Sequence, residues 1–195
     1  MPLFPRLYDL VMAHAEGGRL GNWRSRVVGA SRGRVLEIAA GTGLNFSHYH
    51  DGAFVIGTDP DFSMLARGKD RASRSRASLV LVVADAEVLP FRDGAFDEAV
   101  GGLALCTIPH PERALAELRR TLVPGGRLRL LEHVRSHSSF VGLLQDWCTP
   151  VWRRVAGGCR LNRRTVATVA SCGFVLESVT AHAAGNVQEM IARSP

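Results

Sequence analysis

Short apolar runs alternate with amphipathic stretches along almost the whole chain. Runs rich in Val, Leu and Ile predict strands, and apolar residues at helical spacing predict helices. The predicted strands are 34–39, 54–59, 78–85, 96–105, 127–134, 174–180 and 186–192, and the predicted helices are 5–15, 19–30, 62–72, 111–122, 139–156 and 162–171.

Local signals mark where several of these elements begin and end. Asp61 is a predicted N-cap, and Pro111 starts a helix, where its missing N–H costs nothing. The Pro-Gly-Gly run at 124–126 is predicted to end that helix, and Asn162 to cap the last one. The strand at 78–85 is apolar on both faces.

The alternation of strands and helices predicts an α/β fold with a parallel sheet that helices cover on both faces. Ligands of such sheets bind at the carboxyl ends of the strands, where the strand order reverses. The residues at or just after the carboxyl ends of the strands are therefore site candidates. They are the run 39–43, Asp59, Asp85, the run 105–107 and the pair Glu132 and His133.

The small residues of 39–43 let a ligand lie against the backbone. Asp59 follows Gly43 by 16 residues, and its two carboxylate oxygens can accept hydrogen bonds from two ribose hydroxyls. Asp85 can accept from the exocyclic amine of an adenine while the Ala86 amide donates to a ring nitrogen. These positions predict a cofactor that contains adenosine.

The spacing of the glycines disfavours a dinucleotide. A G-x-G-x-x-G motif needs a third glycine, and Phe46 stands at that position. Glu37 would repel a pyrophosphate, but it can hold the cationic amino end of an amino-acid-bearing cofactor, directly or through water. The sequence therefore favours S-adenosylmethionine over a nicotinamide.

Composition narrows the partners further. The chain has 195 residues, which suits one domain, and no apolar run approaches the ~20 residues that a membrane span needs. The N-terminus lacks a basic start, so we expect a cytoplasmic protein and no secretory signal. The formal charge is +6, but aromatic residues do not interleave with the basic ones, and we expect no nucleic-acid partner.

The cysteines predict free thiols. They stand at positions 106, 148, 159 and 172, and no two are spaced as in a CxxC zinc motif. We therefore expect a reducing compartment and no bound metal.

Four segments together resemble the class I S-adenosylmethionine-dependent methyltransferases, in particular the methyltransferase-11 type. They read VLEIAAGTG, VIGTDPDFSML, VVADAEVLPFRDGAFD and LCTIPHPERALAELRRTLVPGGRLRLLEH, and they cover about residues 33–134. The resemblance implies a three-layer, Rossmann-like sheet of seven strands, mostly parallel with an antiparallel last strand. It also implies that S-adenosylmethionine is the methyl donor and S-adenosylhomocysteine the product.

The resemblance also implies residue roles. Glu37 anchors the amino end of the cofactor, Asp59 takes the ribose, and Pro60 shapes the turn beside the adenine. The remaining cofactor positions are Tyr8, Asp9, Ala39, Gly41, Gly43, Asp85, Ala86, Leu103, Ala104 and Leu105. The family usually has glycine at position 39; alanine there adds a methyl group and permits ordinary φ, so we expect cofactor binding to survive.

A closer resemblance concerns the segments LLEHVRS and QDWCTPVWRRVAGGCRLNRRT. They are similar to the animal alkyl-thiol S-methyltransferases of the methyltransferase-like 7 group and to bacterial phosphatidylethanolamine N-methyltransferase-like relatives. The first choice of acceptor is therefore a small, fairly apolar thiol. A phospholipid amine, a quinone-like ring or a phenol is the alternative, and a catalytically silent cofactor-binding protein is the alternative from another class.

Three residues are candidates for acid–base work on the acceptor. His133 lies at the end of the fifth strand, and histidine is a common general base, so it is either the general base or a structural hydrogen-bonding residue. Glu132 either orients His133 or bonds a loop amide. Asp146 is either a base on a segment that folds over the site or a surface acid.

The segment 138–165 has apolar residues at helical spacing opposite Arg153 and Arg154. It is interpreted as a core-packed helix, as a lid that builds an apolar acceptor pocket, or as a contact with a membrane surface. We divide the single domain into an N-terminal helical cap (1–30), a cofactor-binding core (31–134), a substrate-side lid (135–165) and a C-terminal part (166–195). The sequence leaves the oligomeric state open.

Overall fold

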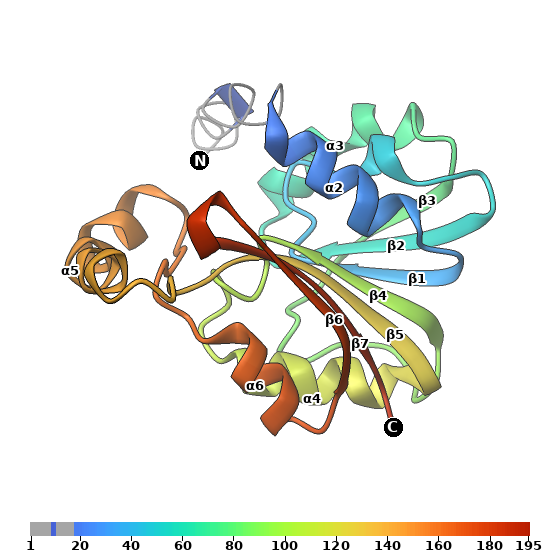
Figure 1. Cartoon of the computed structure of the whole chain (residues 1–195). Helices are drawn as coiled ribbons and strands as arrows, with labels where there is room; N and C mark the ends of the chain where they lie inside the picture. Colours follow the sequence, from blue (N-terminus) through green and yellow to red (C-terminus); the bar gives the residue numbers. More distant parts are fainter. Residues whose placement is uncertain (1–8, 11–17) are drawn as a thin grey trace.

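A seven-stranded sheet organises the molecule (Figure 1). The computed structural model describes residues 9–10 and 18–195. The strand order is β3-β2-β1-β4-β5-β7-β6, and among the described strands β7 alone runs in the direction opposite to the other six. The strands are β1 (Gly33–Ile38), β2 (Ala53–Asp59), β3 (Ser78–Val83), β4 (Phe96–Gly102), β5 (Leu122–His133), β6 (Val175–His182) and β7 (Val187–Arg193). The predicted sheet is confirmed.

Helices cover both faces of this sheet (Figure 1). On one face lie α2 (Arg19–Gly29) and α3 (Phe62–Ser73), and on the other lie α4 (Pro111–Thr121) and α6 (Thr165–Ser171). Two predicted helix starts are confirmed, because the Asp61 side chain accepts a hydrogen bond from the Ser63 amide and Pro111 lies in the first turn of α4. The helix predicted at 5–15 lies almost wholly outside the described residues.

Alternate residues of β1 face two separate cores. Leu36 and Ile38 pack with Leu115 of α4, whereas Val35 packs with Val55 on the opposite face. All of these side chains are fully buried. Because successive side chains of a strand point to opposite faces, one short apolar strand anchors both layers.

Four details of the predicted elements are wrong. β4 ends at Gly102 because Leu103 turns the chain with φ 61°, and β3 is a half-exposed edge strand although it is apolar on both faces. The run 124–126 lies inside β5, which begins directly after α4. Asn162 caps no helix, because α6 begins at Thr165 and the side-chain amide of Asn162 donates to the Asp146 carboxylate.

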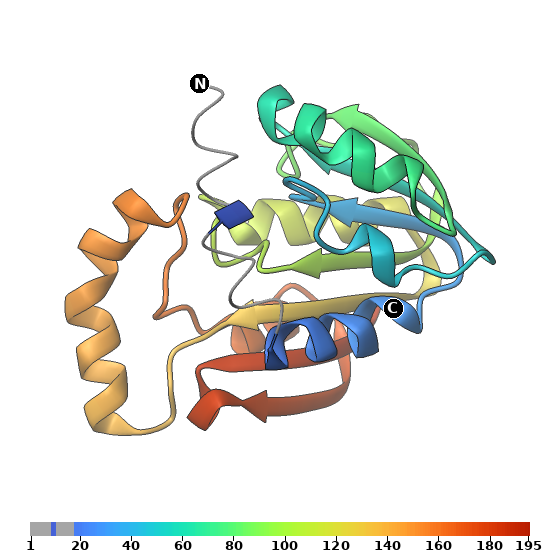
Figure 2. The ribbon, with the colours of Figure 1, turned by 90° about the horizontal axis from the view of Figure 1, so that it is seen from above.

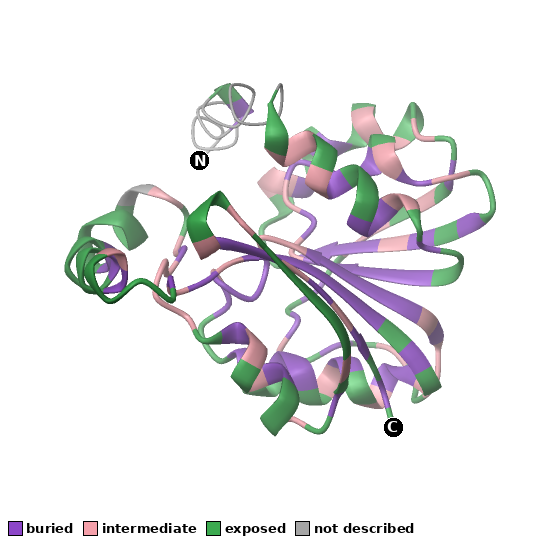
Figure 3. Ribbon diagram, in the orientation of Figure 1, coloured by how far each residue is buried: buried purple, intermediate pink, exposed green. Residues whose placement is uncertain are grey.

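The helix α5 (Ser139–Val155) stands away from the sheet (Figure 2). Most of its described surface is exposed (Figure 3). The exposed apolar side chains are Phe140, Leu143, Leu144, Trp147, Val151 and Trp152. The interpretation of this helix as a core-packed element is therefore wrong for most of its length. Within the described residues, no helix has the length and apolar character needed to span a membrane.

Candidate functional site

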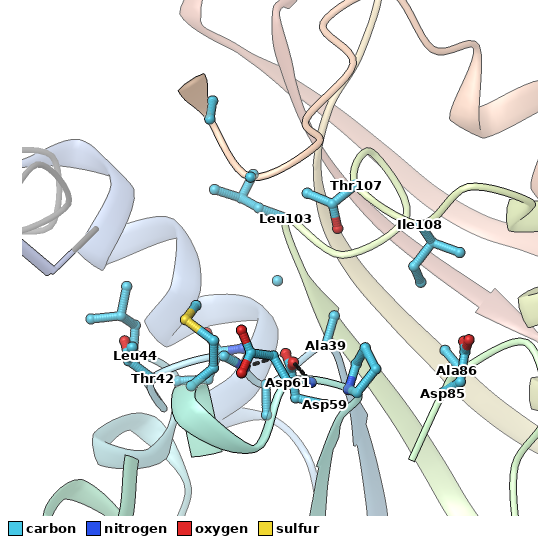
Figure 4. A pocket seen from close by; sticks show the side chains of 18 of the residues that line it. Ala39, Thr42, Leu44, Asp59, Asp61, Asp85, Ala86, Leu103, Thr107 and Ile108 are labelled. Atoms are coloured by element: carbon cyan, nitrogen blue, oxygen red, sulfur yellow. Dashed lines mark hydrogen bonds between the residues drawn. The ribbon is translucent and has the colours of Figure 1, made fainter. Parts of the chain in front are cut away.

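A pocket of about 360 Å³ opens at the carboxyl ends of β1, β2 and β4, where the strand order reverses (Figure 4). Its volume suits a cofactor-sized ligand. Seven predicted cofactor residues line it: Ala39, Gly41, Asp59, Pro60, Asp85, Ala86 and Leu103. Figure 4 shows Leu103, Thr107 and Ile108 facing Ala39 and Asp59 across the pocket.

The loop after β1 runs along one wall of the pocket in left-handed backbone conformations. Gly41 has φ 58° and Gly43 has φ 79°, and a Cβ atom on Gly43 would lie 2.3 Å from the Phe46 ring. Ala39 has φ 47°, so the expectation of an ordinary φ at this position is wrong. Left-handed backbone costs about 1–2 kcal/mol for a residue with a Cβ, so the loop holds Ala39 under strain.

Asp59, the last residue of β2, connects the glycine loop after β1 to the turn after β2. One carboxylate oxygen accepts from the Gly41 amide at 3.0 Å, and the other accepts from the Asp61 amide at 2.9 Å. Burial raises the pKa of this carboxyl, and the two amide hydrogen bonds oppose the rise. Each oxygen of a carboxylate offers two lone-pair sites, so both oxygens keep an acceptor site for a ligand hydroxyl.

Asp85 and Ala86 lie on the segment that follows β3 and form the end of the pocket beside Ile108 (Figure 4). The Asp85 carboxylate accepts from the Glu87 amide at 2.9 Å, which fixes the turn. Asp85 is exposed and Ala86 is buried. This pairing of an exposed acceptor with a fixed backbone amide suits the edge of a flat heterocycle.

Glu37 lies beneath the pocket and not in its described wall. It is 1% exposed, and its two oxygens accept from Asn45 at 2.9 Å and from the Tyr49 hydroxyl at 2.8 Å. Burial raises its pKa to about 7, against the effect of the Tyr49 and Asn45 hydrogen bonds and the Arg24 charge. The structure therefore does not support direct contact between Glu37 and the amino end of a cofactor. Glu37 instead positions Asn45, which lines the pocket.

Arg24 is a pocket residue that the sequence reasoning missed. It is the one basic side chain among the described lining residues, it is 2% exposed, and it donates to the Asn45 side chain at 2.8 Å. Its spacing to Val27 and Val28 puts it on the buried face of α2, which is a signal that the sequence contained.

Glu132 shapes the wall opposite the glycine loop. Its carboxylate accepts from three successive backbone amides, those of Ala104, Leu105 and Cys106, at 2.8–3.0 Å. Of the two predicted roles, the structure shows the loop-amide bond. Burial raises the pKa of Glu132 to about 7, against the effect of these amides. Leu105 is fully buried behind the wall and does not line the pocket.

Neither of the other two acid–base candidates lies in the described pocket wall. The Nδ1 atom of His133 lies 3.4 Å from the Cys159 sulfur. Asp146 pairs with Arg135 at 3.0 Å and accepts from Asn162, and these contacts lower the pKa of its carboxyl. The predicted lid reaches the pocket through Ala156 and Gly157, not through Asp146.

The N-terminal prediction falls partly outside the described residues. Tyr8 is not described. Asp9 is buried and accepts from the Thr42 hydroxyl and from Arg67, both at 2.6 Å. Because Thr42 lines the pocket, Asp9 joins the N-terminal segment to the glycine loop.

Comparisons with known proteins identify related methyltransferases. A methyltransferase-domain family model matches residues 36–130. The chain is 36% identical to the human thiol S-methyltransferase over 72% of its own length and 59% of the relative's. It is 35% identical to the ubiquinone/menaquinone biosynthesis C-methyltransferase of Azotobacter vinelandii over 90% of its own length and 71% of the relative's.

A solved structure shows the same fold. The S-adenosylmethionine-dependent methyltransferase of Thermotoga maritima superposes with a TM-score of 0.69 at 21% identity, covering 97% of this chain and 94% of that one. The chain spans a little over half the length of several curated relatives that it matches, between 53% and 59%. With its motifs, its sheet and its pocket in agreement, the chain belongs to the methyltransferase-domain family, whose methyl donor is S-adenosylmethionine.

Proposed function

We propose that the protein transfers the methyl group of S-adenosylmethionine to a small, fairly apolar thiol. The pocket at the strand-order reversal carries this proposal, because it combines a glycine loop, a buried carboxylate and a buried guanidinium. In the proposal, Asp59 accepts from the two ribose hydroxyls, Asp85 and Ala86 bind the adenine, and Arg24 binds the cofactor's carboxylate. The cofactor supplies an electrophilic methyl group, so the protein contributes mainly orientation and exclusion of water.

Two features support an apolar acceptor. Leu103 and Ile108 line the side of the pocket opposite the glycine loop (Figure 4), and Ala156 also lines the pocket. One relative acts on thiols by its name, and the other takes part in quinone biosynthesis. Methylation at a quinone-like ring carbon is the second candidate. Methylation at a ring carbon needs a base that takes up a proton. The bases in the described pocket wall are limited to three carboxylates, those of Asp59, Asp61 and Asp85.

Calorimetric titration with S-adenosylhomocysteine tests the cofactor site. Asp59→Ala removes two hydrogen bonds to a charged group, each worth about 1.5–3 kcal/mol, so we expect affinity to fall at least about 100-fold. Asp51→Ala, on the exposed turn before β2, is the matched control and should bind as the wild type does. Equal affinity of the Asp59→Ala and wild-type proteins would contradict the ribose assignment.

A labelled-methyl assay tests the acceptor. An alkyl thiol, a reduced quinone, a phenol and phosphatidylethanolamine vesicles are compared at equal concentration. We expect label in the thiol. Label in the quinone or the vesicles alone overturns the thiol assignment but leaves the cofactor site intact.

We also propose that α5 brings the protein to an anionic lipid surface. Its exposed apolar side chains include Trp147, at 84% exposure, and they end beside the exposed Arg153 and Arg154, whose charges complement anionic headgroups. We expect co-sedimentation with vesicles that contain phosphatidylglycerol, weakened by Trp147→Ser and unchanged by Phe62→Ser on α3, which is also exposed. A dimer in light scattering that Trp147→Ser dissociates would instead assign this face to a second copy.

A further inference from the structure

Three side chains that can bind a metal converge behind the pocket wall. Cys106 lies in the turn after β4, His133 ends β5, and Cys159 follows α5. One ligand atom from each lies within 4.8 Å of the other two. Cys106 and Cys159 are buried, and His133 is half-buried. None of the three side chains belongs to the described wall of the cofactor pocket, so the cofactor site does not account for their clustering.

Two of the three distances between the ligand atoms are close to those around one tetrahedral ion. The two sulfurs are 3.7 Å apart, and the Cys159 sulfur is 3.4 Å from Nδ1 of His133. With Zn–S bonds of 2.3 Å and a Zn–N bond of 2.0–2.1 Å, tetrahedral angles place two sulfurs about 3.8 Å apart and a sulfur and nitrogen about 3.6 Å apart. For these two pairs of ligand atoms, a zinc ion requires shifts of only a few tenths of an ångström, and the Cys106 sulfur and the nearest His133 nitrogen lie within 4.8 Å of each other.

The backbone holds two of these ligands in position. The Cys106 amide donates to Glu132 at 3.0 Å, and its carbonyl accepts from the Arg160 amide at 2.8 Å. The second bond joins the turn of Cys106 directly to the turn of Cys159. The Cys159 amide in turn donates to the Ala156 carbonyl at 3.1 Å. Ligands fixed by such supporting contacts are typical of real metal centres.

We propose that Cys106, His133 and Cys159 bind one Zn²⁺ ion and leave its fourth coordination position open. Two thiolates and an imidazole match the ligand preference of zinc, and three protein ligands with an open position are typical of catalytic zinc. Thr107, next to Cys106, and Gly157, two residues before Cys159, line the cofactor pocket. The ligands are far apart in the sequence, which is why no CxxC spacing predicted the site.

The open position has a chemical use that rests on the proposed thiol methylation. A thiol that binds there loses its proton to solvent, because a coordinating thiol is deprotonated. Its sulfur then forms a bond to the methyl carbon while the carbon–sulfonium bond breaks, and that electron pair stays on the sulfur of S-adenosylhomocysteine. The product is a neutral thioether, which binds zinc more weakly than a thiolate and leaves.

Metal analysis of the purified chain tests the site. After loading with zinc and desalting, the wild type should hold one zinc per chain. Cys106→Ser, Cys159→Ser and His133→Ala should each hold less than a tenth of that amount. Cys148→Ser, at an exposed position of α5, is the matched control and should hold one. The Co²⁺-loaded wild type should show sulfur-to-cobalt charge-transfer absorption, which each ligand variant lowers and Cys148→Ser preserves.

Two further measurements separate this site from the proposed function. An alkyl thiol should shift the Co²⁺ spectrum, and a chelator should abolish thiol methylation while leaving S-adenosylhomocysteine affinity unchanged. Failure to retain zinc, or a Cys106–Cys159 disulfide in non-reducing peptide mapping, overturns the zinc proposal. Retained zinc with no methylation of any thiol overturns the thiol function and leaves the metal site standing.

Discussion

Glu37 makes the stability of this protein depend on pH in an unusual direction. Most buried carboxylates with partners stabilise a protein as pH rises, but burial raises the pKa of Glu37 from 4.5 to about 7. Between these values the folded state holds a proton that the unfolded state releases. The contribution is therefore fully present below about pH 4.5 and is lost as pH rises through about 7. A shift of this size corresponds to about 3 kcal/mol.

The perturbation that isolates this effect is Glu37→Gln. Glutamine keeps the size of the side chain and can accept from Asn45 while its amide group donates to the Tyr49 oxygen, replacing the two hydrogen bonds of the carboxylate. It does not titrate. The free energy of unfolding of the variant, relative to wild type, should therefore rise by about 3 kcal/mol between pH 4.5 and pH 8.

Urea unfolding at half-unit pH steps measures the difference, and an unchanged m-value ensures that the unfolded states are comparable. Glu112→Gln, at an exposed position in α4, controls for the change in net charge. A wild-type-to-variant difference that is the same at pH 4.5 and pH 8 would refute the reasoning. It would mean that Arg24 and the two hydrogen bonds keep Glu37 ionised throughout.

Three further predictions test other parts of the structure. Ala39→Gly should leave the free energy of unfolding in urea unchanged or raise it by up to about 1 kcal/mol. Glycine relieves the strain of the left-handed backbone at position 39, and this gain offsets the added entropy of the unfolded chain. A loss of stability larger than that of Ala40→Gly would contradict the strain at position 39. Arg129→Ala leaves Glu98 buried and unpaired and should lower the free energy of unfolding by about 3–5 kcal/mol. Arg127→Ala breaks an exposed ion pair two residues away and should lower it by about 0–1 kcal/mol. Equal losses in the two variants would contradict the role of burial. The affinity for S-adenosylhomocysteine should fall on acidification. Because burial raises the pKa of Asp59, this fall should begin at a higher pH than it would for an exposed aspartate. Calorimetry of Asp59→Asn should show weak binding that does not depend on pH in this range.

The sequence predicted the sheet well because the signals for its strands are local. Most strands carry their own apolar run, and many turns carry a Gly, Asp or Pro. The order of elements, the place of Asp59 at the end of β2 and that of Asp85 just after β3 therefore follow from short windows. Features that depend on contacts with neighbouring elements could not be predicted from short windows of sequence. The φ of Ala39 is fixed by the bond from the Ala40 amide to Thr58 on the next strand. The half-exposure of β3 follows from its place at the edge of the sheet.

The residues behind the pocket wall show a different kind of limit. Glu132 and His133 are neighbours in the sequence, and their position allowed two roles for Glu132, to orient His133 or to bond a loop amide. In a strand, successive side chains point to opposite faces, so the two side chains are separated by the backbone they share. Glu132 holds the amides of 104–106, while His133 meets Cys159 from a loop after α5. One loop, fixed by a single buried carboxylate, thus presents Leu103 and Thr107 to the cofactor pocket and Cys106 to His133 and Cys159. Because the cofactor pocket and the proposed zinc site both depend on that loop, a change in the loop would affect both of them.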